Sequence, residues 1–142
     1  MKKEHLDYIR KFNRFYTKIL GVLNKHYLGS EFGLPEIRVI QDIYLHPNRS
    51  SKDISGELNM DKGLLSRILK KLEQKEYIYR ESVAKDNRKE VIKLTKDGCK
   101  IYHVLNAAAD QSVKDIFGNL EDQQLQELVK SMKIIFDIMN HD

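Results

Sequence analysis

Hydrophobic residues recur every three or four positions through long stretches of the chain, a spacing that places them on one face of an α-helix. One such stripe runs from Lys2 to about Leu28. A second helix begins at Leu34-Pro35-Glu36, where proline suits the first turn, and ends before the turn signal His46-Pro47-Asn48. Two further helices are expected over about Lys96–Phe117 and Glu121–Asn140. Long helices therefore dominate both ends of the chain.

The middle of the chain carries shorter elements. We expect a short helix with Ser51 as its N-cap, a break at Asn59-Met60, and a helix that Asp61 caps and that runs to about Lys75. The period then changes to two, which predicts strands over Tyr77–Val83 and Glu90–Leu94 with the polar segment 84–89 between them. This order predicts a mainly α fold with a small β-hairpin, in the layout of a winged helix-turn-helix.

The helix after Asp61 has two contrasting faces. Its inward positions are Leu65, Ile68, Leu69 and Leu72, and the opposite face carries Lys62, Gly63, Ser66, Arg67 and Lys70. An arginine can bind guanine O6 and N7 with two hydrogen bonds, and a glycine lets the backbone approach DNA closely. Lysines suit phosphate oxygens, which fix the position of a helix without reading sequence. The pattern predicts a DNA-reading helix.

The polar connection between the two strands adds positive charge next to that helix. Lys85, Arg88 and Lys89 surround the expected turn, and Asp86 is close enough in sequence to orient the Arg88 guanidinium. A narrow minor groove attracts an arginine carried on such a projection. We also expect Ser51, at the start of the preceding helix, to contact a phosphate.

Charge is unevenly distributed over the 142 residues, although the net charge is only +4. Residues 61–93 carry ten Lys and Arg against six Asp and Glu, whereas residues 99–142 carry four against seven. The excess of positive charge in the middle suits a protein that presents this part of the chain to a polyanion.

The run from Ser51 to Glu73 resembles the helix-turn-helix of the MarR family, the multiple antibiotic resistance regulators. Asp86-Asn87-Arg88 is similar to the Asp-Arg-Arg motif of the family's wing, and Leu94-Thr95-Lys96-Asp97-Gly98 matches its Leu-Thr-x-x-Gly continuation. Asn87 stands where the family often has a second arginine, and Glu76 occupies the place of a usual glycine after the reading helix. With length and helix order, the resemblance covers nearly the whole chain.

The resemblance implies a homodimeric, DNA-binding transcription regulator, most commonly a repressor that an effector releases from a pseudo-palindromic operator. It divides the chain into dimerisation helices, residues 1–30 and 96–142, and a DNA-binding lobe, residues 34–95. By position it places on the reading surface Lys62, Gly63, Leu64, Ser66 and Arg67, with Arg88 on the wing. Family members often bind small molecules between the two lobes, where the candidate effector residues are Tyr16, Tyr27 and Tyr44.

Other chemistry finds little support in the sequence. The five histidines are scattered, and Cys99 stands alone, so we expect no metal, no cofactor, no intrachain disulfide and no catalytic set of side chains. With no apolar stretch long enough for a membrane span and no signal peptide, a cytoplasmic protein is expected. Two alternatives stay open: a winged-helix module that binds protein instead of DNA, and a constitutive repressor that senses nothing.

Overall fold

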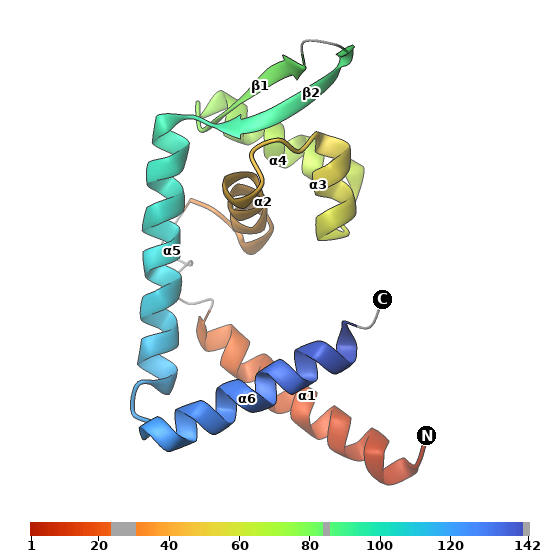
Figure 1. Cartoon of the computed structure of the whole chain (residues 1–142), viewed down its shortest axis with the longest axis vertical. Helices are drawn as coiled ribbons and strands as arrows, with labels where there is room; N and C mark the ends of the chain where they lie inside the picture. Colours follow the sequence, from red (N-terminus) through yellow and green to blue (C-terminus); the bar gives the residue numbers. More distant parts are fainter. Residues whose placement is uncertain (24–30, 84–85, 141–142) are drawn as a thin grey trace. The chain divides into compact units, whose positions relative to one another are not determined.

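The computed structural model describes residues 1–23, 31–83 and 86–140. Its elements, in order, are α1 (Lys3–Leu23), α2 (Leu34–Leu45), α3 (Ser51–Leu58), α4 (Lys62–Gln74), β1 (Ile78–Val83), β2 (Asp86–Leu94), α5 (Lys96–Phe117) and α6 (Asp122–Met139) (Figure 1). These are the helices and the hairpin that the hydrophobic pattern predicts, although the expected continuation of the first helix to about Leu28 lies outside the described residues. They group into two compact units, residues 1–23 with 110–142, and residues 24–109. Of the helices described, none is both long and apolar enough to span a bilayer.

The core of the second unit joins α2, α3, α4 and the hairpin. Ile40, Ile54 and Leu72 are at most 1% exposed, and Ile92 brings β2 into the same cluster. In Figure 1 the hairpin lies beside α3 and α4, with β1 in contact with α4 and β2 in contact with α3. Since the inward face of α4 is buried against this core, its other face is available to a partner.

The N-cap of α3 differs from the sequence prediction. Ser50, not Ser51, caps the helix: its Oγ accepts a hydrogen bond from the Asp53 amide at 3.2 Å, and Asp53 Oδ2 accepts one from the Ser50 amide at 2.9 Å. The backbone amide of Ser50 holds the pKa of Asp53 below its usual value. The prediction was wrong by one residue because two serines are adjacent, and the carboxylate at N3 selects the first. Ser51 is therefore the first helical residue.

The start of α4 agrees with the sequence prediction. Asp61 is the N-cap, and its Oδ2 accepts a hydrogen bond from the Leu64 amide at 3.0 Å. Asn59, between the two helices, takes a left-handed conformation with φ 46°, which asparagine tolerates better than most residues. A tight left-handed turn therefore sets the angle at which α4 leaves α3.

The C-terminal end of α4 keeps a left-handed residue although glycine is missing there. Glu76 has φ 58°, the Glu76 amide donates to the Glu73 carbonyl, and the Tyr77 amide donates to the Leu72 carbonyl. These are the two hydrogen bonds of a Schellman C-cap. Thr95 Oγ1 donates to the Glu76 carbonyl at 2.7 Å, which helps to hold the strained residue. The helix thus ends as it would with glycine.

The hairpin is longer than the sequence predicts. β1 pairs antiparallel with β2, with Ile78 opposite Leu94 and Val83 opposite Asp86, and the register shifts between Ser82 and Val83. Pairing therefore continues to Asp86, and residues 86–89, expected in the turn, belong to β2. Lys85 lies outside the described residues. Alternation failed to show this extension because residues 86–89 are all charged or polar.

The first unit contains α1, α6 and the last part of α5, and it leaves much apolar surface exposed. Phe15 is 58% exposed and Phe136 65% exposed. A groove of about 470 Å³ runs between the helices, with α1 residues such as Phe12 and Tyr16 on one wall and α6 residues such as Met132 on the other. In the described part of this unit, the apolar side chains form no enclosed core like that of the second unit.

Candidate nucleic-acid interface

The outward face of α4 carries the residues expected to read DNA. Lys62, Gly63, Ser66, Arg67 and Lys70 are all exposed, and Leu64 is half-buried against the core. The inward residues Leu65 and Leu69 are 2% and 1% exposed. The helix therefore has one committed apolar face and one polar, positively charged face, as its sequence predicts.

A hollow next to this face gathers three of the predicted residues. It has a volume of about 290 Å³ and lies between α3, α4 and β1, where Ser51, Lys62 and Ser66 line it. Two cationic residues outside the predicted set, Lys52 and Arg80, line it as well. The signal for Arg80 was its place in β1, two residues after the buried Ile78 and so on the same face of the strand.

Arg80 ties the hairpin to α4. Its Nε donates a hydrogen bond to Glu73 Oε1 at 2.8 Å, and its Nη1 lies 3.9 Å from Glu90 Oε2 on β2. Glu73 belongs to the last turn of α4, so the ion pair connects the base of the hairpin with the helix. The relative position of helix and hairpin is thus fixed by side chains as well as by the core.

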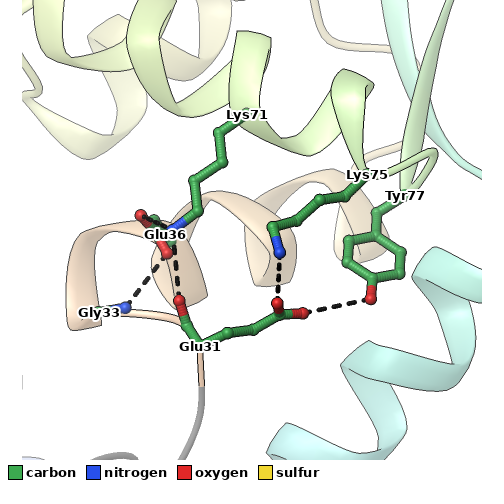
Figure 2. A network of polar contacts seen from close by, with 6 residues as sticks. All are labelled: Glu31, Gly33, Glu36, Lys71, Lys75 and Tyr77. Atoms are coloured by element: carbon green, nitrogen blue, oxygen red, sulfur yellow. Dashed lines mark hydrogen bonds and ion pairs between the residues drawn. The ribbon is translucent and has the colours of Figure 1, made fainter.

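A second polar network holds the same end of α4 to the first turn of α2 and the segment before it (Figure 2). Glu31 accepts hydrogen bonds from Lys75 Nζ and, at 3.2 Å, from the Tyr77 hydroxyl. Lys71 Nζ donates to Glu36 Oε1 at 2.9 Å and to the Glu31 carbonyl at 3.2 Å. The hydrogen bond from Lys75 is the main cause of the lowered pKa of Glu31. These contacts orient α4 without using its exposed face.

The backbone of the two predicted wing residues, Asp86 and Arg88, lies in the hairpin. Asp86 and Arg88 lie in β2, and Asp86 pairs with Val83 across the hairpin. Both belong to the end of the hairpin farthest from Leu94 and α5. The predicted contact between their side chains stays a prediction.

The candidate effector tyrosines are dispersed. Tyr16, in the first unit, is half-buried and stacks on Phe12 with ring centroids 5.7 Å apart. Tyr44, in the second unit, stacks on Tyr102 of α5 with centroids 3.7 Å apart. Tyr27 lies outside the described residues. The ring contacts of Tyr16 and Tyr44 are each made within their own unit.

Comparisons with known proteins agree with this architecture. The sequence model of the MarR family matches residues 33–90, which include α2, α3, α4 and most of the hairpin. The transcriptional regulator SarZ of Staphylococcus haemolyticus is 27% identical, over 98% of this chain and 84% of its own.

Two solved structures show the same fold over nearly the whole length. A point mutant of S. aureus MepR superposes with a TM-score of 0.79 at 18% identity and covers 99% of this chain and 100% of its own. Streptococcus pneumoniae FabT, solved in complex with DNA, gives a TM-score of 0.78 at 20% identity and covers 95% of this chain and 96% of its own. The matched segment and the regulator SarZ relate this chain to the MarR family of transcriptional regulators, and the solved structures show that it has the same winged-helix fold.

Proposed function

We propose that the second unit binds double-stranded DNA, with α4 in the major groove and the hairpin at the adjacent minor groove. The exposed cationic face of α4, opposite its buried leucines and isoleucine, is the observation that carries this proposal. A major groove admits one helix, and a helix that enters it must present side chains committed to nothing else. FabT, which shares this fold, was solved with DNA.

Each exposed residue of α4 suits a different contact. Arg67 is the candidate for direct reading of guanine, while Lys62 and Lys70 neutralise phosphates on either side. Gly63 lets the backbone come close, and Ser66 can donate to or accept from a base edge or a phosphate. Leu64, half-buried at the edge of the core, offers apolar contact.

The hairpin and the start of α3 complete the contact surface. Arg88 on the wing is proposed to enter the minor groove, with Asp86 as the residue that orients it. Ser51 is proposed to contact a phosphate from the first turn of α3, where amide groups and the helix dipole favour an anion. The DNA-binding lobe would then be residues 34–95.

Two copies of the chain are proposed to form the active species through residues 1–30 and 96–142. The exposed apolar side chains of α1 and α6 support this, because a monomer rarely leaves so many in water. Two-fold symmetry would place the reading helices roughly 34 Å apart and match half-sites about ten base pairs apart. We propose a repressor that an effector releases, with Tyr16, Tyr27 and Tyr44 as candidate effector residues and with no catalytic activity. In a bacterial cell this function would place the protein in the cytoplasm, where the DNA is.

The proposal is tested by selecting sequences bound by the full chain from random duplex DNA, followed by fluorescence anisotropy with the selected duplex. We expect a pseudo-palindromic consensus, binding by two chains, and an affinity at least about a thousand-fold above that for unrelated DNA. Failure to enrich any sequence, with no binding even at low salt, would overturn DNA binding and favour a protein-binding module.

A further inference from the structure

The hollow between α3, α4 and β1 has the lining of an anion site. Its polar residues are the cationic Lys52, Lys62 and Arg80 and the hydroxyl-bearing Ser51 and Ser66, around an apolar floor of leucines. A third serine on its wall, Ser55, already donates its hydroxyl hydrogen to the Met60 carbonyl at 2.7 Å. Among the described residues that line this hollow, none carries a carboxylate.

A neighbouring hollow of about 410 Å³ shares one wall with this one but differs in charge. Ser51, Lys52 and Arg80 line both, yet the neighbour has Lys89 in place of Lys62 and also contains the carboxylates of Asp53 and Glu90. Carboxylates repel a phosphate at short range, so the first hollow is the better binding site for an anion.

Arg80 is oriented to bind an anion in the first hollow. It pairs with Ile92, which is 1% exposed, so its side chain leaves the hairpin on the face that packs against the helices. The hydrogen bond to Glu73 uses the Nε–H and fixes the plane of the guanidinium, which carries four further N–H donors on Nη1 and Nη2. Glu90 Oε2 lies 3.9 Å from Nη1, beyond hydrogen-bond distance. A guanidinium held in this way can bind a phosphate with two parallel hydrogen bonds.

We propose that this hollow holds one phosphodiester group of the DNA backbone and that Arg80 is its principal ligand, supported by Lys52 and Ser51. This inference rests on the proposed DNA binding and adds to it a contact from the base of the hairpin. Because Arg80 is also bound to the last turn of α4, the phosphate sets the depth at which the reading helix enters the groove. Arg80 is thus a phosphate ligand that reads no sequence.

Arg80→Gln tests the proposal, with Lys93→Gln as the matched control. Lys93 lies on the opposite face of the same hairpin, in a 3.0 Å ion pair with Glu81, so both variants lose one charge and the ion pairing of one side chain. For Arg80→Gln we expect the slope of log affinity against log salt to fall by about 0.9, the value for one released counterion, and no change for Lys93→Gln. Equal slopes for the two variants would overturn the proposal.

Neutral methylphosphonate linkages, placed one at a time along the selected duplex, locate the phosphate. One linkage per half-site should weaken binding of the parent chain by about ten-fold and binding of Arg80→Gln by less than about two-fold. If every linkage weakens the two proteins equally, Arg80 is not the ligand. If Arg80→Gln loses thermal stability, the comparison is repeated with Lys52→Gln, because the side chain of Lys52 is exposed. A parent chain that binds no duplex contradicts the proposed function itself, whereas a binding parent with unchanged Arg80→Gln contradicts only this site.

Discussion

Gly98 of α5 lies directly against the carbonyl group of Tyr77, and a Cβ atom at position 98 would stand 2.0 Å from the Tyr77 oxygen. The same carbonyl accepts a hydrogen bond from the Thr95 amide at 3.0 Å, and the Gly98 amide donates to Thr95 Oγ1 at 3.0 Å. The Leu-Thr-x-x-Gly motif thus joins the end of β2 and the start of α5 to the residues that end α4.

Gly98→Ala should therefore destabilise the protein by about 2 kcal/mol or more, because a backbone carbonyl cannot move aside as a side chain can. Urea unfolding followed by circular dichroism measures this loss. Gly56→Ala is the matched control, because a Cβ there meets nothing within 4 Å. Alanine at this position of α3 should increase the free energy of unfolding by about 0.5–1 kcal/mol. Equal stabilities for the two variants would contradict the close approach at Gly98.

Glu76→Gly should stabilise the protein by about 0.5–1 kcal/mol. A left-handed conformation costs a residue with a Cβ about 1–2 kcal/mol, and glycine removes this cost. Glycine is also more flexible in the unfolded chain and loses more entropy on folding, which offsets part of the stabilisation. Glu76→Ala, which keeps the Cβ, should change the stability by less than about 0.5 kcal/mol. A less stable Glu76→Gly would mean that the glutamate side chain makes a stabilising contact.

Arg67→Ala should weaken binding to the selected duplex by about 1–3 kcal/mol and relax the preference at one base pair of each half-site. Anisotropy with single-base variants of the duplex measures both effects. Lys70→Gln should instead weaken all sequences alike and reduce the salt slope by about one. Lys130→Gln on α6 removes the same charge outside the proposed interface and should leave both measurements unchanged. A uniform effect of Arg67→Ala over all base pairs would reassign this arginine to a phosphate.

The elements of the fold could be predicted because each rests on a local signal. The stripe from Leu65 to Leu72 predicts the buried face of α4, and Asp61 predicts its N-cap. The N-cap of α3 and the length of the hairpin escaped the prediction for equally local reasons: two adjacent serines compete at 50 and 51, and the strand before Glu90 shows no alternation.

Contacts between distant residues could not be predicted in the same way. Arg80 meets Glu73 and the hollow only because β1 turns back along α4, and nothing in the sequence around Arg80 states which helix it faces. The proposed reading face of α4 could be predicted because a helix places residues three and four apart on one side, whereas the proposed phosphate site combines three elements.

Asp42 on α2 is a buried carboxylate whose ionisation should affect stability. It is 7% exposed, its Oδ1 accepts a hydrogen bond from Arg49 Nη1 at 2.5 Å, and its Oδ2 has no hydrogen-bond partner among the described residues. Burial raises the pKa of Asp42, and the charges of Arg49 and His46 oppose this only in part. The folded protein therefore holds the Asp42 proton to higher pH than the unfolded chain does.

Stability should fall as pH rises from the pKa of Asp42 in the unfolded chain, near the ordinary aspartate value of about 3.9, to its higher pKa in the folded protein. We expect the free energy of unfolding of the parent, minus that of Asp42→Asn, to decrease from about pH 4 upward and then level off. Asp53→Asn serves as a control with the opposite sign, because the pKa of Asp53 is lowered. A difference that grows with pH for Asp42 would mean that attraction to Arg49 outweighs the cost of burial.

Phe136→Glu should separate the proposed dimer. Phe136 is 65% exposed and lies among other exposed apolar residues of α6, so in a dimer its ring would be buried and a carboxylate there would lose its hydration. Sedimentation equilibrium should give twice the chain mass of 16.7 kDa for the parent and the single-chain mass for the variant. Gln126→Glu adds the same charge at an exposed polar position of α6 and should remain dimeric.

Because two reading helices on one duplex add their contacts, the monomeric variant should also lose at least about a hundred-fold in affinity for the full operator, yet keep its affinity for a single half-site. A Phe136→Glu dimer that binds the operator like the parent would place the contact between copies elsewhere on the chain.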